Sequence, residues 1–198
     1  MFGPVIEGER VRLEPPRPEH APMFQRWFAD LEVTRFLRRR NPPTLREEED
    51  ALEKAADDPQ MVLWAIVLKA SGKLIGGTVL EKIDWRISRD AESGIMIGDR
   101  SEWCQGYATE VMRLRTDYAF RDLGLRKIWT GVDIPNEGSR RALEKVGYRQ
   151  CGLMRRHFFV DGQWVDVWLA EIFREDWERS HEEAGVAGRR ARRRPDAT

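Results

Sequence analysis

Residues 95–110, IMIGDRSEWCQGYATE, decide the fold. Ile95 to Ile97 are apolar and end a predicted strand, and apolar side chains recur at helical spacing from Gln105 onwards. The stretch therefore predicts a strand, a glycine-containing turn and the start of a helix. Such a turn points unpaired backbone N–H groups at one place, where the helix dipole also favours an anion, so a phosphate would fit there. Gly106 allows a close approach, although many helices begin with a glycine turn and bind nothing.

A second polar loop follows the next predicted strand, which spans Ile128 to Asp133. Asn136-Glu137-Gly138-Ser139 opens a short helix that ends at Gly147. A ligand in an open α/β sheet binds outside the carboxyl ends of the strands, where it would meet both loops. The simpler interpretation is that Asn136 and Ser139 only cap the helix, as such residues often do.

The remaining elements fix the fold class. Strands are expected at 9–14, 61–69, 73–83 and 92–98, with a late hairpin over 154–173 that turns at Asp161-Gly162. Helices are expected after Pro18, after the Thr44–Glu47 capping box, and over 105–123. A helix between the strands at 92 and 128 requires a parallel crossover. We predict an α/β fold of the mixed α+β kind, with helices packed on a central sheet.

The chain changes character after Trp177. Residues 178–198 are rich in Glu, Ala, Gly and Arg and end in GRRARRRPDAT, with too few apolar side chains to form a core. We expect one domain over residues 1–177 and a disordered, Arg-rich tail over residues 178–198.

Composition excludes several classes of protein. The chain has 34 basic and 34 acidic side chains, so no overall charge favours nucleic acid or an anionic membrane. Cys104 and Cys151 are its two cysteines, and no Cys/His cluster has the spacing of a metal site, so neither a disulfide framework nor a metal is expected. No apolar run is long enough to span a membrane, and the first residues lack a signal pattern. We expect a cytoplasmic protein.

The order of these motifs resembles the acetyl-CoA site of the GNAT N-acetyltransferases. The matching pieces are Trp103 to Ala108, Asn136 to Ser139 and Glu144-Lys145-Val146-Gly147-Tyr148. The opening GERVRLEPP, the helix with Trp27 and the late FFVDGQWVDVWL also resemble the RimJ/RimL branch, the ribosomal-protein N-terminal acetyltransferases. The resemblance implies the GNAT fold, mostly antiparallel with helices on both faces, and an acetyl-CoA-dependent N-acetyltransferase.

The resemblance also implies roles for individual residues. The pyrophosphate would lie on backbone N–H groups of the turn, the pantetheine arm would pair with the strand, and the thioester would lie near the second loop. The implied cofactor-binding residues are Ile95, Met96, Ile97, Cys104, Gln105, Gly106, Tyr107, Ala108, Thr109, Asn136 and Ser139. Glu92 matches a carboxylate that relatives use as a base, and the alternative is an ion-paired or solvated strand residue. Ser139 would donate a hydrogen bond to the leaving sulfur.

Three positions depart from the family pattern. Trp103 replaces the usual Gln or Arg, and Cys104 stands where a second Gly is common, so its Cβ lies where the backbone can need a positive φ. Leu143 stands where spermidine-type relatives have a tyrosine that protonates the CoA thiolate. We therefore expect catalysis without that acid.

The sequence leaves the acceptor amine open. Trp27, Phe36 and Trp85 are candidates for its binding site, although Trp27 also fits an ordinary core aromatic. Protein N-termini, polyamines, aminoglycosides and other small amines are all candidates, as is succinyl-CoA in place of acetyl-CoA. An alternative is an inactive GNAT-fold module that binds RNA or ribosomes through the Arg-rich tail. Homodimerisation is common in relatives and would use the hairpin from Phe158 to Leu169.

Overall fold

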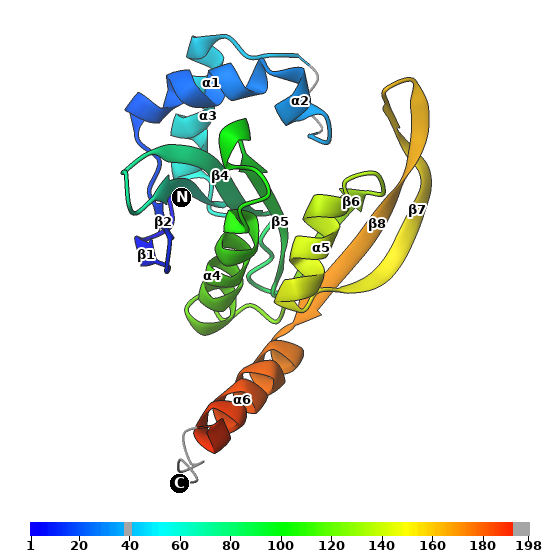
Figure 1. The fold of residues 1–198 in the computed structure, drawn as a ribbon. Coiled ribbons are helices and arrows are strands. Elements are labelled where there is room, and N and C mark those ends of the chain that lie inside the picture. The colour runs from blue at the N-terminus through cyan, green and yellow to red at the C-terminus, as the bar shows by residue number, and fades with distance from the viewer. Residues whose placement is uncertain (38–40, 192–198) are drawn as a thin grey trace, which may run out of the picture.

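A single eight-stranded sheet forms the centre of the computed structural model, which describes residues 1–37 and 41–191 and, of the side chains, those of 1–37 and 41–183 (Figure 1). The spatial order is β1-β2-β3-β4-β5-β6-β8-β7. The strands are β1 (Ile6–Glu7), β2 (Val11–Glu14), β3 (Val62–Leu68), β4 (Leu74–Glu81), β5 (Asp90–Ile97), β6 (Lys127–Asp133), β7 (Arg149–Val160) and β8 (Gln163–Phe173). Among these eight strands of the described residues, β5 and β6 pair in parallel and every other pair is antiparallel, so the predicted mostly antiparallel sheet with one parallel crossover is confirmed.

Helices cover both faces of the sheet, as predicted. They are the 3-10 turn η1 (Pro18–His20), α1 (Ala21–Phe28), α2 (Leu31–Thr34), α3 (Leu45–Asp57), the 3-10 turn η2 (Arg100–Glu102), α4 (Tyr107–Arg121), α5 (Glu137–Val146) and α6 (Arg174–Ala191). Buried residues of α4 and α5 pack with Leu80 and Ile128, whereas those of α1 and α3 pack with Leu74 and Met96. The sheet therefore has an α4 face and, opposite, an α1 face.

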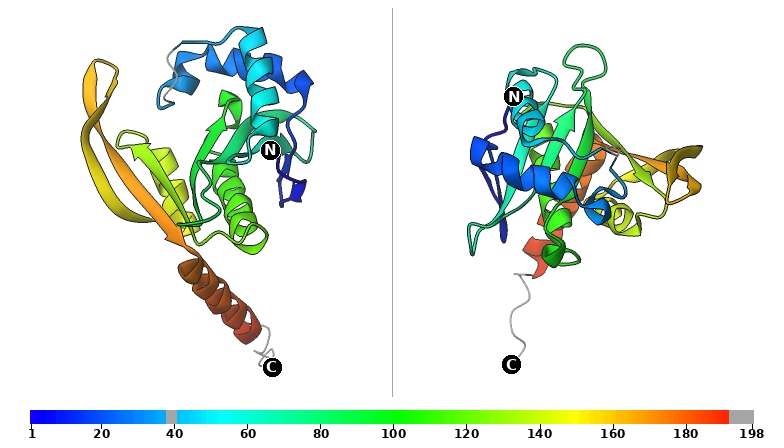
Figure 2. Two further views of the ribbon diagram at one scale, coloured as in Figure 1. Left: turned by 180° about the vertical axis from the view of Figure 1, so that it is seen from behind. Right: turned by 90° about the horizontal axis from the view of Figure 1, so that it is seen from above.

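Local signals in the sequence explain where several elements begin and end. The hydroxyl of Thr44 accepts from the N–H of Glu47, whose carboxylate accepts from the N–H of Thr44, so the predicted capping box opens α3. Asp161 and Gly162 have φ of 49° and 78°, the twist that a two-residue hairpin turn requires. The β7–β8 hairpin begins at Arg149, earlier than predicted, and projects beyond the body of the molecule (Figure 2).

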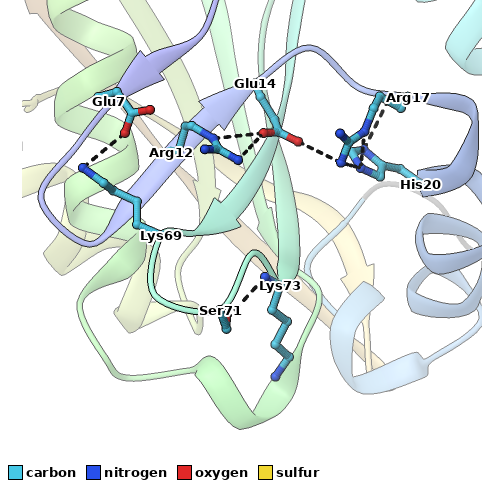
Figure 3. Close-up of polar contacts among 8 residues, drawn as sticks. All are labelled: Glu7, Arg12, Glu14, Arg17, His20, Lys69, Ser71 and Lys73. Carbon is cyan, nitrogen blue, oxygen red and sulfur yellow. Dashed lines mark hydrogen bonds and ion pairs between the residues drawn. The ribbon is translucent and has the colours of Figure 1, made fainter.

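A polar cluster fixes η1 and the start of α1 to the end of β2 (Figure 3). The carboxylate of Glu14 lies between Arg12 and Arg17, with N–O distances of 2.9 and 3.1 Å. The backbone N–H of Arg17 donates to Nδ1 of His20, and the His20 ring packs edge-on against Phe24. Burial lowers the pKa of His20, which favours the neutral ring that accepts this hydrogen bond.

The C-terminal segment corrects one expectation. Residues 178–191, expected to be disordered, continue α6, whereas residues 192–198 lie outside the described part of the chain. The indole of Trp177 packs 5.6 Å from the ring of Phe120 and donates to Asp117, which anchors the helix to α4. Beyond this anchor Glu, Ala and Arg favour helix by intrinsic propensity, without a core. No helix in the described residues is long and apolar enough to cross a membrane.

Candidate active site

The sheet opens where β5 and β6 separate. Their parallel register runs from Asp90 opposite Lys127 to Glu92 opposite Trp129. One residue further on, the hydroxyl of Thr130 donates to the carbonyl of Ser93 over 2.9 Å. A side chain thus takes the place of the backbone hydrogen bond that continued pairing of β5 with β6 would form. The remainder of β5 faces a gap on its β6 side.

The backbone of β5 presents hydrogen-bonding groups to this gap. The N–H of Gly98 donates to the carbonyl of Ile75 at the edge of β4, so even-numbered residues of β5 point their backbone groups towards β4. Odd-numbered residues then point towards β6, which places the N–H groups of Ile95 and Ile97 in the gap. The indole of Trp103 donates to the carbonyl of Ile97 over 2.7 Å and covers the end of the strand. An extended ligand with amide groups fits beside this edge, as a further strand would.

The turn before α4 has the conformation that the sequence predicts. Gly106 caps α4 with φ of 83°, and Cys104 has φ of 60° without being glycine. The expectation that Cys104 lies where the backbone needs a positive φ is therefore confirmed. Among the described residues, the N–H groups from Cys104 to Ala108 donate to no backbone carbonyl. These free donors and the dipole of a 15-residue helix form a site that fits the phosphates of a nucleotide.

Arg10, which the sequence analysis did not select, adds positive charge to this turn. Its guanidinium donates to the carbonyl of Gln105 over 2.9 Å, lies 3.1 Å from Glu110 and stacks on Tyr107. Burial raises the pKa of Glu110, but hydrogen bonds from Arg10 and the N–H of Val11 outweigh this effect and lower it overall. The loop before β2 is thereby fixed to the first turn of α4.

The second predicted loop lies beyond the carboxyl end of β6. Asn136 caps α5, since its side-chain oxygen accepts from the N–H of Ser139 over 3.3 Å. The simpler interpretation, a helix cap, is thus correct for Asn136, and it does not exclude contact with a ligand. Ser139 is half-buried on the same turn. Since β5 and β6 are parallel neighbours, both loops lie at one edge of the sheet.

Glu92 points to the α1 face. It lies opposite Glu81 of β4 and Trp129 of β6, whereas Leu80, the neighbour of Glu81 along β4, points to the α4 face. Its carboxylate lies 2.6 Å from the ammonium of Lys82, with 16% of the side chain exposed. The ion-paired alternative for Glu92 therefore describes the structure. This contact uses Oε2, and a role as base would use Oε1 or require Lys82 to move away.

The three aromatic candidates for the acceptor site do not come together. Trp27 is buried, packs edge-on against Phe24 and lies so close to Gly98 that a Cβ there would be 2.1 Å from the indole. The indole of Trp85 donates to the carbonyl of Pro59, which follows α3. Trp85 itself lies in the loop that precedes β5, so it is at the opposite end of β5 from the turn. Phe36 alone lines a surface pocket.

That pocket, of about 210 Å³, lies between the segment after α2 and the β7–β8 hairpin. Arg35 and Asp161 pair across it at 2.7 Å. Pro135 also lines it and precedes the cap residue Asn136, so the pocket adjoins the second loop. In Figure 1, α2 and the tip of the hairpin flank the opening above α5.

Two buried residues shape the α4 face of the gap. Leu143 on α5, at the position of the family tyrosine, is 2% exposed and belongs to the main core. Arg115 on α4 is buried and donates to the carbonyl of Gly94. The sequence analysis missed Arg115, although one signal was present: it lies four residues from both Val111 and Ala119, on the apolar stripe of the helix.

Comparison with known proteins identifies the family. The acetyltransferase (GNAT) domain model matches residues 10–149. The uncharacterized N-acetyltransferase p20 of Bacillus licheniformis is 26% identical over 172 residues, which is 85% of this chain and 96% of that protein. The spermidine N(1)-acetyltransferase of Escherichia coli K12 is 29% identical over 119 residues, 60% of this chain and 63% of that protein.

A solved structure has the same fold. The spermidine N-acetyltransferase of Vibrio cholerae, in complex with CoA and spermine, superimposes with a TM-score of 0.79 at 21% identity, covering 85% of this chain and 98% of that one. The chain therefore belongs to the GNAT acetyltransferase family and is an acetyl-CoA-dependent N-acetyltransferase.

Proposed function

We propose that the chain acetylates a primary amine by direct attack of the neutral amine on a bound thioester. The observation behind this proposal is the open edge of β5 at Ile95 and Ile97 beside the free N–H groups of the turn. When bound, acetyl-CoA supplies the thioester. Residues 104–108 hold the pyrophosphate through backbone N–H groups, whereas the N–H of Thr109 donates to the carbonyl of Gly106. Residues 95–97 pair with the pantetheine arm, and Asn136 and Ser139 lie along that arm.

Two side chains assist the transfer in this proposal. Glu92 accepts, directly or through water, the proton that the amine nitrogen loses as the new C–N bond forms. The hydroxyl of Ser139 donates a hydrogen bond to the sulfur, which leaves with the electron pair of the broken C–S bond. Leu143 has no polar atom for this task, so Ser139 takes the place of the family tyrosine.

The acceptor that we propose first is a small cationic amine of the polyamine type. Relatives named spermidine N(1)-acetyltransferase support it, as does the pocket beside Pro135, where Asp161 offers a carboxylate that is 59% exposed. Such an amine is protonated in solution, with a pKa of about 10, and needs a base. Glu92 would supply that base.

A protein N-terminus is the second candidate acceptor. Leu143 lacks the acid of the spermidine-type enzymes, and the RimJ/RimL-like stretches at both ends of the domain favour this branch. An α-amine has a pKa of about 8 and needs less help to lose its proton. An ion-paired carboxylate such as Glu92 suits this acceptor as well.

Thermal unfolding with and without acetyl-CoA tests the proposal, with succinyl-CoA and ATP as comparisons. A ligand at about 100 times its Kd stabilises a fold by roughly 2.7 kcal/mol. We expect acetyl-CoA to raise the Tm and ATP to leave it unchanged. A panel of spermidine, spermine and peptides with free N-termini, followed by CoA release, then identifies the acceptor. If acetyl-CoA gives no shift, the assigned site is wrong.

A further inference from the structure

Arg115 is a charged residue in the middle of the main core. Only 1% of it is exposed, and it lies on the side of α4 that faces the sheet. Burying a cation costs free energy unless hydrogen bonds or an opposite charge compensate it. Buried ion pairs can often be replaced by apolar residues of similar volume without loss of stability, so packing alone does not explain an arginine at this position.

The guanidinium of Arg115 is bound chiefly to one peptide group. Its Nη1 donates to the carbonyl of Gly94 on β5 and to the hydroxyl of Thr78 on β4, both over 2.7 Å. The Thr78 hydroxyl in turn donates to the same carbonyl over 2.9 Å. Within the part of the chain that the structure describes, the buried Nε has no hydrogen-bond partner and no carboxylate pairs with Arg115, whereas the side chain of Tyr148 also interacts with the guanidinium. Nη1 of this cation is directed at the Gly94 carbonyl.

That carbonyl shares a peptide group with the N–H of Ile95. The peptide is trans, so the carbonyl and the N–H point in opposite directions. Since the Gly94 carbonyl points to β4 and Arg115, the Ile95 N–H points into the gap beside β6. A hydrogen bond accepted at one end of a peptide group polarises the group and strengthens the donor at the other end. A cation has a larger effect than a neutral donor.

We propose that Arg115 is a positioning residue that polarises the Gly94–Ile95 peptide and so strengthens the N–H that contacts the thioester carbonyl. This inference rests on the proposed function, in which the pantetheine arm pairs with residues 95–97, and it adds that the Ile95 N–H is the donor to the thioester carbonyl. Negative charge develops on the carbonyl oxygen when the amine attacks, and a pre-oriented donor lowers the barrier. The surrounding core is apolar, so the field of the guanidinium is weakly screened.

Isotope-edited infrared spectroscopy of bound acetyl-CoA, labelled with ¹³C at the thioester carbonyl and without an acceptor, measures this polarisation. A stronger hydrogen bond lowers the carbonyl stretching frequency. Arg115→Met removes the charge, Arg115→Gln keeps a neutral donor, and Arg115→Lys restores a cation. We expect the band of the Met and Gln variants to shift towards that of free acetyl-CoA, and the Lys variant to recover part of the difference.

Kinetics provide a second readout. We expect kcat of Arg115→Met to fall by about tenfold, less than the roughly 100- to 1,000-fold that follows when an oxyanion donor is removed outright. The KM for acetyl-CoA should change by less than about threefold, because the interaction strengthens mainly in the transition state. Arg113→Met is the control, since Arg113 is exposed on the same helix and donates to the carbonyl of Lys145.

The outcomes separate this inference from the proposed function. If the unsubstituted protein binds acetyl-CoA with the carbonyl band of the free compound, the proposed place of the thioester is wrong. If the band is shifted but is identical in Arg115→Met, the role of Arg115 is refuted, even where the Tm or kcat falls. If Arg115→Met does not fold, Arg115→Gln decides by the same criterion.

Discussion

The turn before α4 and the pocket proposed for the acceptor are built in opposite ways. The turn offers backbone N–H groups, whose positions depend on local conformation at Cys104 and Gly106. The pocket is built from side chains of the segment after α2, the loop after β6 and the β7–β8 hairpin, which are far apart in the sequence. One short motif therefore forms the proposed donor site, whereas several distant segments form the proposed acceptor site.

The largest effect that we expect tests the acceptor side. Glu92→Gln removes the proposed base, and kcat should fall by about 100-fold, at the low end of the roughly 10²–10⁴-fold range of general base catalysis. The pH–rate profile should also lose the limb that reports the base. Steady-state rates from about pH 4 to 9 measure both, at saturating acceptor.

Glu81→Gln is the matched control for Glu92, because Glu81 lies directly opposite on β4 and faces the same side of the sheet. It should leave the pH profile unchanged. If Glu92→Gln also retains the parental profile, Glu92 is only the ion-pair partner of Lys82, and solvent accepts the proton.

An intermediate effect tests the backbone site. Gly106→Val places a β-branched side chain at φ of 83°, where such residues are strained, and its Cβ would lie 3.4 Å from Nη2 of Arg10. We expect the affinity for acetyl-CoA to fall by about 30-fold, equivalent to roughly 2 kcal/mol. Calorimetric titration measures this loss. Gly138→Ala, where no atom lies within 4 Å of the new Cβ, should bind as the parent does.

The smallest effect concerns Cys104. A non-glycine residue in the left-handed region costs about 1–2 kcal/mol. Replacement by glycine removes this cost, but the greater entropy of glycine in the unfolded chain offsets part of the gain. We expect Cys104→Gly to raise the Tm by about 1–3 °C and to bind acetyl-CoA at least as tightly. Cys104→Ala keeps the Cβ and should give no gain. Equal effects of both variants would assign the change to the thiol instead.

Sequence patterns predicted the sheet, its crossover and the turn because each depends on residues that are close together. The capping box at Thr44 and the hairpin turn at Asp161 follow from side-chain chemistry within four residues. The GNAT resemblance added the cofactor-binding residues, whose contacts stay predictions until a complex is measured.

The features that the sequence patterns did not predict depend on contacts between distant segments. Lys82 pairs with Glu92 only because β4 and β5 are neighbours in the sheet, and Arg10 meets the turn only because β2 packs beside α4. Trp85 is a candidate for the acceptor site because the family resemblance implies that the loop after the third strand folds over that site, and tertiary structure holds its indole against Pro59. Trp177 anchors the first part of α6 to α4, a contact between distant segments, and beyond it the helix continues through the intrinsic propensity of Glu, Ala and Arg.

The short parallel pairing between β5 and β6 has a mechanical consequence. Its register contains three residue pairs, whereas β6 and β8 share seven, so the sheet consists of two antiparallel halves joined by a weak line. Under a stretching force the halves would part there first, and amide exchange would be fastest along the same line. An acetyl-CoA molecule that pairs with β5 would hold the two halves together along this line, so its binding would also set the stiffness of the whole sheet.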